Sequence, residues 1–213
     1  MKTDELIGLL AADVAPVPRH EGQRRLWLAL GGGGLLALLW IALAYGVRPD
    51  LGQVFFTPAF AMKEAMPLAV LAGAAVAVYR LAHPGARLGG WAWAMVAPVL
   101  VLWAMAGWVW WQAEPAAREA LLWGSTWRTC AVSVLLAALP VGACLFWALK
   151  GMAPTRPALA GAAAGWLAGA TGAAVYALHC PETGMPFMAV WYVLGMTASA
   201  GLGALVGARG LRW

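Results

Sequence analysis

The sequence predicts an all-α membrane protein built as a bundle of six transmembrane helices. Hydrophobic residues make up 63% of the 213 residues and charged residues only 11%, whereas soluble domains carry about 25% charged residues. Apolar runs of roughly 18 or more residues are typical of membrane-spanning helices, and the alternating pattern of a membrane β-barrel is absent from the sequence. The basic residues never cluster with aromatic residues in a polar stretch, so nucleic acid is not expected as a direct partner.

Residues 1–25 are predicted to form a cytoplasmic N-terminal segment with one short amphipathic helix. Thr3 suits the N-cap position, and Asp4 and Glu5 would occupy the first turn, where the helix dipole favours acidic side chains. Four apolar residues recur at helical spacing and form a single stripe, namely Leu6, Ile7, Leu10 and Val14.

Residues 26–213 are predicted to form one transmembrane domain. Six apolar segments of about 20 residues are each long enough to cross a hydrocarbon core about 30 Å thick. They are Leu26–Val47, Ala61–Leu81, Trp91–Trp111, Thr129–Leu149, Pro157–Leu178 and Pro186–Gly207. The second segment is the least regular, because Lys63, Glu64 and Pro67 stand in its first turns.

The distribution of basic residues predicts the orientation of the bundle. Ten Lys and Arg residues fall on the side of the termini and four on the other side. By the positive-inside rule both termini are expected in the cytoplasm of a bacterial cell, with the protein as a multi-pass component of the inner membrane. Small residues spaced four apart form ridges on the fifth and sixth segments, namely Gly161, Gly165, Gly169, Gly203 and Gly207. Such ridges let helices approach closely, and we expect packing within one bundle rather than a dimer interface.

Two of the three cysteines are expected to form a pair at the outer side. Cys130 begins the fourth segment and Cys180 follows the fifth, so both lie at the same outer depth. Cys144 lies 14 residues beyond Cys130, about 21 Å along a helix. Cys130 and Cys180 therefore face an oxidising compartment together, provided that the ends of their helices pack against each other.

The residues alone leave three interpretations of this pair open. It could be a structural disulfide or two unpaired small residues, or it could be a redox switch in which the thiol and disulfide forms favour different helix arrangements. It could also bind a heavy-metal or zinc ion, with Cys130, Cys180, His179 and Glu182 as ligands. No CxxC motif supports the metal interpretation.

The sequence offers little for catalysis or coupled transport. Apart from Lys63 and Glu64, the six segments hold no ionisable residue away from their ends, whereas proton and ion pathways need such residues. No H-E-x-x-H or G-x-S-x-G motif occurs, and we do not expect an enzyme.

The N-terminal stripe of Leu6, Ile7 and Leu10 could dock in the groove of a partner protein or lie on the lipid bilayer. Acidic residues surround the stripe and would be repelled by an anionic inner leaflet, namely Asp4, Glu5 and Asp13. This charge favours a protein partner.

Three segments carry a resemblance to a known family. They are Met1–Ile7 with Leu9, Leu10, Ala11, Asp13 and Pro16, then Trp127–Cys130, and then Leu178–Glu182 followed by Ala189–Tyr192. In this order and spacing they are similar to NrsF-type proteins, which are six-span proteobacterial membrane anti-sigma factors. The similarity covers essentially the whole chain, although Cys144 and the Gly184-Met185-Pro186 stretch have no counterpart in the pattern.

The resemblance implies a membrane protein that sequesters an extracytoplasmic-function sigma factor and releases it under stress. It implies that Cys130 and Cys180 sense heavy metals or oxidants, and that the N-terminal helix binds the sigma factor through Asp4, Leu6, Ile7, Leu10 and Asp13. The alternative functions are a small membrane permease or metal exporter, and a purely structural membrane subunit.

Overall fold

The computed structural model describes residues 3–12, 18 and 20–211. Every regular element in these residues is a helix. Six helical segments are long and apolar enough to cross a membrane, which confirms the predicted number of spans. The long helices are α2 (Glu21–Ala44), α4 (Pro58–Leu81), α5 (Trp91–Gln112), α7 (Trp127–Lys150), α8 (Pro157–Ala177) and α10 (Val193–Gly210). The short ones are α1 (Thr3–Ala12), α3 (Leu51–Val54), α6 (Pro115–Trp123), α9 (Met185–Phe187) and the π-helical turn η1 (Met188–Tyr192) that joins α9 to α10.

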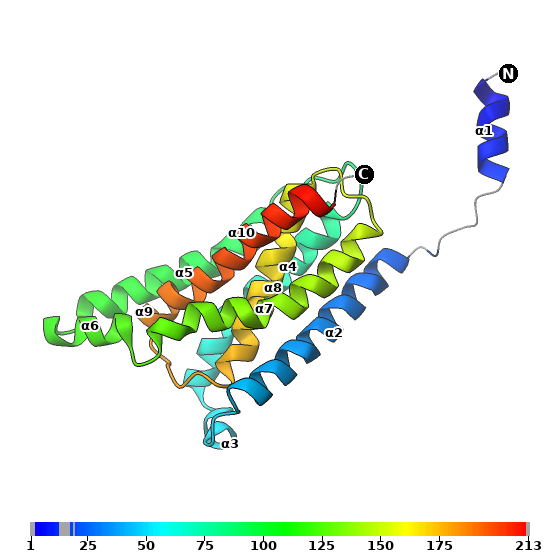
Figure 1. Ribbon diagram of the computed structural model, residues 1–213. Coiled ribbons are helices and arrows are strands. Elements are labelled where there is room, and N and C mark those ends of the chain that lie inside the picture. The colour runs from blue at the N-terminus through cyan, green and yellow to red at the C-terminus, as the bar shows by residue number, and fades with distance from the viewer. Residues whose placement is uncertain (1–2, 13–17, 19, 212–213) are drawn as a thin grey trace.

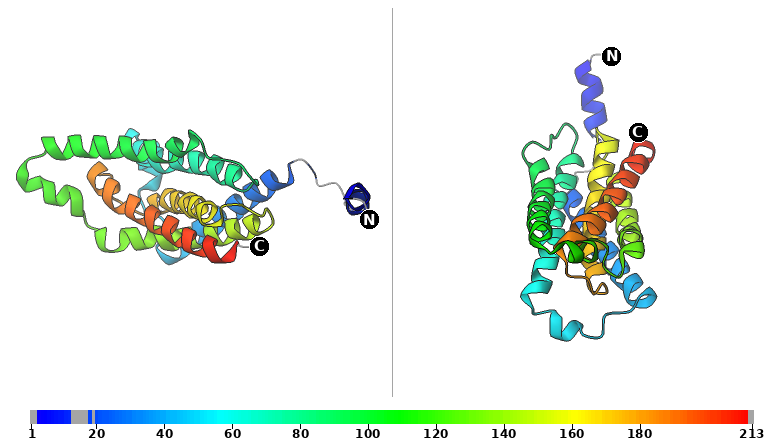
Figure 2. Two further views of the ribbon diagram at one scale, coloured as in Figure 1. Left: turned by 90° about the horizontal axis from the view of Figure 1, so that it is seen from above. Right: turned by 90° about the vertical axis from the view of Figure 1, so that its left-hand side faces the viewer.

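The long helices form one elongated bundle with α8 at its centre (Figures 1 and 2). Helices α10, α7, α4 and α2 all contact α8, and α5 covers the outer face of α4. Helix α8 is rich in Ala and Gly, and most of its residues are buried. Small side chains allow several neighbours to approach one helix at once, so the composition of α8 explains its central place.

The glycine ridges predicted from the sequence do join α8 to α10. A Cβ atom added at Gly161 would collide with the backbone of Gly203, and one added at Gly165 would collide with the backbone of Ser199. The backbones of the two helices are therefore in direct contact, which agrees with the expected packing within one bundle.

Helix α4 begins one turn earlier than the sequence predicts. Its N-cap is Thr57, whose hydroxyl oxygen accepts a hydrogen bond from the backbone N–H of Phe60 at 3.3 Å, and Pro58 occupies the first helical position. The earlier start places Lys63 and Glu64 inside the helix rather than at its fraying end.

Helix α1 confirms the predicted N-terminal helix and lies apart from the bundle in Figure 1. Thr3 is the first helical residue of α1 rather than a residue before it. None of its residues is buried. Asp13, Val14 and Pro16 lie outside the described residues.

We expect the α8–α10 contact to be the most sensitive packing surface of the bundle. Gly203→Val would drive a side chain into the backbone of Gly161, and overpacking of this kind typically costs about 1–3 kcal/mol. The thermal unfolding midpoint in detergent should fall clearly. Gly201→Val on the same helix is the matched control, because nothing lies within 4 Å of its added Cβ. Equal midpoints for the two variants would show that the close contact does not stabilise the bundle.

Candidate thiol site

The structure brings Cys130 and Cys180 together at one end of the bundle. Cys130 lies in the first turn of α7, and Cys180 lies in the turn that follows α8. Both side chains are 0% exposed and belong to the same buried cluster. Both are free thiols, and the thiol of Cys130 lies within reach to donate a hydrogen bond to the sulfur of Cys180. Cys144 packs elsewhere, beside Leu28 and Trp147 in a separate apolar recess.

Two helix ends position these sulfur atoms. The backbone N–H groups of His179 and Cys180 both donate to the carbonyl of Tyr176 at 3.0 Å, which closes the last turn after α8. The backbone N–H of Cys130 donates to the carbonyl of Thr126 at 3.0 Å, at the start of α7. The Thr126 hydroxyl is also 3.9 Å from the Cys180 sulfur. A C-terminal helix turn and an N-terminal helix turn therefore meet at the thiols.

Two tyrosines enclose the thiols from the inner side. Tyr176 of α8 is 1% exposed and Tyr192 of η1 is 0% exposed, with ring centroids 6.0 Å apart. The Tyr192 hydroxyl makes no hydrogen bond within the described part of the chain, and it lies near enough to Cys180 to stabilise a thiolate there. The π-helical turn gives Tyr192 its place, and such turns are frequent at functional sites. The only sequence signal for this residue was its place in the Ala189–Tyr192 segment of the resemblance.

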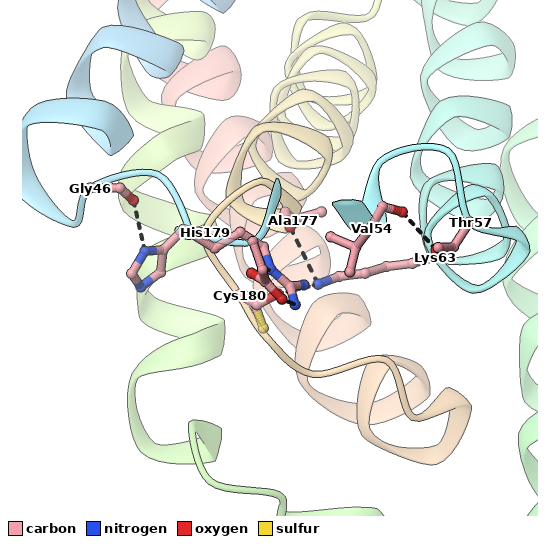
Figure 3. A network of polar contacts seen from close by, with 9 residues as sticks. Gly46, Val54, Thr57, Lys63, Ala177, His179 and Cys180 are labelled. Carbon is pink, nitrogen blue, oxygen red and sulfur yellow. Dashed lines mark hydrogen bonds and ion pairs between the residues drawn. The ribbon is translucent and has the colours of Figure 1, made fainter. Parts of the chain in front are cut away.

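Lys63 reaches the thiol turn from α4 (Figure 3). Its side chain is 1% exposed, and its ammonium group donates to the carbonyl of Cys180 at 2.6 Å and to that of Ala177 at 3.4 Å. These carbonyls stand at the C-terminal end of α8, where the helix leaves acceptors free and the dipole favours a cation. The sequence prediction gave Lys63 no role. The available signal was a lysine inside an apolar span, which by itself marks a candidate functional residue.

The charges near the turn favour the thiolate form of Cys180. The pKa of Cys180 is lowered because the Cys130 thiol donates a hydrogen bond to the thiolate and the Lys63 ammonium attracts it, which together outweigh the effect of burial. Arg48, in the loop after α2, is held by Asp50 through two hydrogen bonds of 2.7 Å, and the pKa of Asp50 is lowered by these bonds. Thiolates rather than thiols are the reactive form of cysteine, so this site suits thiol chemistry.

The other two predicted metal ligands, His179 and Glu182, are engaged elsewhere. The Nδ1 atom of His179 is 2.9 Å from the carbonyl oxygen of Gly46. The Glu182 carboxylate accepts hydrogen bonds from the backbone N–H and the hydroxyl of Ser125, at 2.7 and 2.6 Å. The chain leaves room for this carboxylate at Gly124, which has φ of 51° and whose added Cβ would lie 2.8 Å from it.

No group of three or more His, Cys, Asp or Glu side chains that could hold a metal ion occurs among residues 3–12, 18 and 20–211. The predicted four-ligand set is therefore not assembled in this arrangement, because His179 and Glu182 each fasten a neighbouring loop. The binding of a heavy-metal or zinc ion at Cys130 and Cys180 stays a prediction.

Comparison with known proteins places these features in one family. Residues 10–213 match the family model described as NrsF, negative regulator of sigma F. A relative from Azospira oryzae named probable anti-sigma-F factor NrsF is 43% identical over 213 residues, covering 100% of both chains. The anti-sigma-F factor NrsF of Caulobacter vibrioides is 43% identical over 216 residues, again covering 100% of both chains. No solved structure matches the chain.

We expect mild oxidation of the purified protein with diamide to join Cys130 and Cys180 within one chain. Thiol capping with a polyethylene-glycol maleimide after denaturation would show two thiols lost from the wild-type protein. Cys144→Ser should lose the same two thiols, whereas Cys130→Ser or Cys180→Ser should lose none. A disulfide that involves Cys144, or one that forms only between chains, would contradict the geometry of the site.

Proposed function

The chain belongs to the NrsF family, and from this premise we propose that it is a membrane-bound anti-sigma factor whose buried thiol pair controls the release of its sigma factor. Its relatives are named as regulators, which agrees with the expectation that the chain is not an enzyme. The partner is a sigma factor of the extracytoplasmic-function class, and the protein holds it at the bacterial inner membrane. The observation that carries the proposal is the meeting of Cys130 and Cys180 at one end of the bundle, opposite the N-terminal helix.

The N-terminal helix offers the surface for the sigma factor. Leu6, Ile7 and Leu10 of α1 are 41%, 59% and 66% exposed, and nothing in the described bundle covers them. An amphipathic helix with such a stripe typically lies in an apolar groove of a partner. Acidic residues accompany the stripe at Asp4 and Glu5, so a groove with basic residues at its rim is the complementary surface.

The topology supports opposite sides for the two functions. The start of α2 and the C-terminus lie at one end of the bundle, and α3 and α6 lie toward the other (Figure 1). The excess of Lys and Arg on the terminal side supports a cytoplasmic location for that end by the positive-inside rule. The thiols then face the periplasm, where disulfides form and persist.

The chemistry of sensing is a two-electron oxidation of the thiol pair by a peroxide. The Cys180 thiolate attacks one oxygen of hydrogen peroxide, which gives a sulfenic acid and, after proton transfer, one water molecule. The sulfur of Cys130 then attacks the sulfur of Cys180, a disulfide bond forms, and a second water molecule leaves. Two thiols and one peroxide thus become one disulfide and two waters.

The disulfide changes both the packing and the charge at this end of the bundle. It ties the start of α7 to the end of α8, and it removes the thiolate near Lys63. Helix α7 packs tightly on α2, since a Cβ added at Gly33 would lie 2.6 Å from the Cα of Val141. Because α2 leads directly from the sigma-binding segment, a shift of α7 alters how that segment is presented.

Capture of the sigma factor should depend on the apolar stripe of α1. In cells that produce the protein and its sigma factor, Leu6→Glu and Leu10→Glu should move the sigma factor from the membrane fraction to the cytosol. Gly8→Glu is the matched control, because it adds the same charge on the opposite face and does not disfavour the helix. Unchanged membrane retention in both Leu variants would rule out the stripe as the docking surface.

Release should depend on the two paired thiols and not on the third. Reporter transcription from a sigma-dependent promoter should rise with peroxide in the wild type and in Cys144→Ser, and should lose that response in Cys130→Ser and Cys180→Ser. A cadmium arm separates the two triggers, since two thiolates can also bind one soft metal ion. If both single variants keep the full response to peroxide and cadmium, the thiol pair is not the sensor.

A further inference from the structure

Lys63 is a buried cation that no carboxylate neutralises in the described residues. The ion pairs found there join arginines to Glu21 or Asp50. The adjacent Glu64 forms no ion pair with Lys63 in the described residues, and its buried Oε1 atom makes no hydrogen bond there. A buried ammonium is costly unless it is paired, so the surroundings of Lys63 need a compensating charge.

The groups that face this ammonium come from four different segments. These segments bring charged or polar groups to Lys63 and the thiols: Cys130 on α7, the Cys180 turn, Tyr192 on η1, and the Arg48–Asp50 pair in the loop after α2. Glu64 is next to Lys63 on α4 itself. Arg48 is a second cation, and it forms an ion pair with Asp50. The ring of Tyr192 lies 5.8 Å from the ammonium nitrogen and offers only a weak attraction. The Glu182 carboxylate of the same turn is held by Ser125, which leaves a thiolate at Cys180 as the anion of this turn that the ammonium attracts.

The hydrogen bonds of Lys63 link its charge to the position of Cys180. The 2.6 Å bond goes to the carbonyl of Cys180 itself, and the 3.4 Å bond goes to Ala177 on the last turn of α8. These bonds cross from α4 to the turn, so they fix the backbone that carries the reacting sulfur. The other bonds that hold the turn join it to α8 itself, to the loops after α2 and to the segment before α7, so in the described residues the bonds of Lys63 are its hydrogen bonds to α4.

We propose that Lys63 is the positioning residue of the thiol pair: from α4 it fixes the Cys180 turn against Cys130 and supplies the positive charge that favours the Cys180 thiolate. This inference deepens the proposed function and rests on it for its biological meaning. A stabilised thiolate has two consequences. It stabilises the dithiol relative to the disulfide, which makes the pair more oxidising, and it raises the thiolate fraction that reacts with peroxide.

The test compares variants of the full-length purified protein in lipid nanodiscs, without the sigma factor. Lys63→Met removes charge and hydrogen bonds, Lys63→Gln keeps hydrogen-bond donors without charge, and Lys63→Arg keeps both. Lys150→Met is the matched control, because Lys150 is an exposed lysine at the far end of α7. Circular dichroism and gel filtration establish that each variant is folded before the thiols are measured.

Two measurements separate a role in thiol chemistry from a role in packing alone. In glutathione redox buffers, Lys63→Gln should shift the equilibrium about tenfold toward the disulfide, which corresponds to about 30 mV. At pH 7 it should slow disulfide formation by peroxide by about tenfold. Lys63→Arg and Lys150→Met should remain within about threefold of the wild type in both measurements.

The opposite results would overturn the inference. If Lys63→Gln leaves both values within threefold of the wild type, the charge of Lys63 does not act on the thiols. If Lys63→Arg shifts them as far as Lys63→Gln does, Lys63 serves only to fill space. Because no sigma factor is present, either failure leaves the proposed anti-sigma function standing. A failure of the release experiment would in turn leave the thiol measurements valid.

Discussion

The close approach of four helices to α8 is the constraint on which the rest of this structure depends. Most buried residues of α8 are Ala or Gly, with Leu167, Thr171 and Tyr176 as the exceptions, so α10 packs on it backbone to backbone through Gly161 and Gly165. The same property allows α7 to approach at Gly172, where an added Cβ would lie 2.7 Å from the carbonyl oxygen of Val134. Because its neighbours are this near, the end of α8 lies within side-chain reach of both α7 and α4. The thiol site exists only at such a crowded helix end.

The sequence predicts those features of the fold that depend on the residues of a single segment. The six spans follow from apolar runs, the close packing of α8 and α10 within the bundle follows from their glycine ridges although the pairing of these two helices does not, and the shared level of Cys130 and Cys180 follows from where their spans begin and end. Each of these inferences needs only the local pattern and the thickness of a membrane. They hold because the bilayer permits few alternatives to a bundle of spanning helices.

The site beyond the two sulfur atoms could not be predicted in the same way, because its contacts join distant parts of the chain. Lys63 and Cys180 are 117 residues apart in sequence, and their contact depends on how α4 leans on α8. The same is true of the contacts of His179 and Glu182. Tertiary packing gives them partners at Gly46 and Ser125, 133 and 57 residues away. The position of the Tyr192 side chain depends on the π-helical turn η1, and a π-helical turn cannot be recognised from hydrophobic periodicity in such a short apolar stretch.

The burial of the thiols bears on which signals the site can receive. Both cysteines are 0% exposed, so a large redox protein has no direct access to either sulfur in this arrangement. A small oxidant or a single metal ion needs only a local opening of the turn, and the Glu182–Ser125 hydrogen bonds lie across that turn. Local openings of exposed loops cost far less than global unfolding. For the proposed sensor, this geometry favours reaction with small reagents over disulfide exchange with a partner protein.

In the proposed mechanism, the charge balance between Lys63 and Cys180 couples oxidation of the thiols to the packing of the helices. In the proposed reduced state a thiolate at the end of α8 balances the buried cation on α4, and oxidation would remove the anion while the cation remains. An unbalanced buried charge is strongly unfavourable, so the oxidised state gains from any movement that lets Lys63 reach water or another anion. Such a movement displaces α4 from the end of α8 at the moment when the new disulfide binds α7 to it. In the proposed mechanism the two helices that flank α8 at this end would therefore move in opposite senses, and α2, which packs on α7, would transmit this movement toward the N-terminal helix.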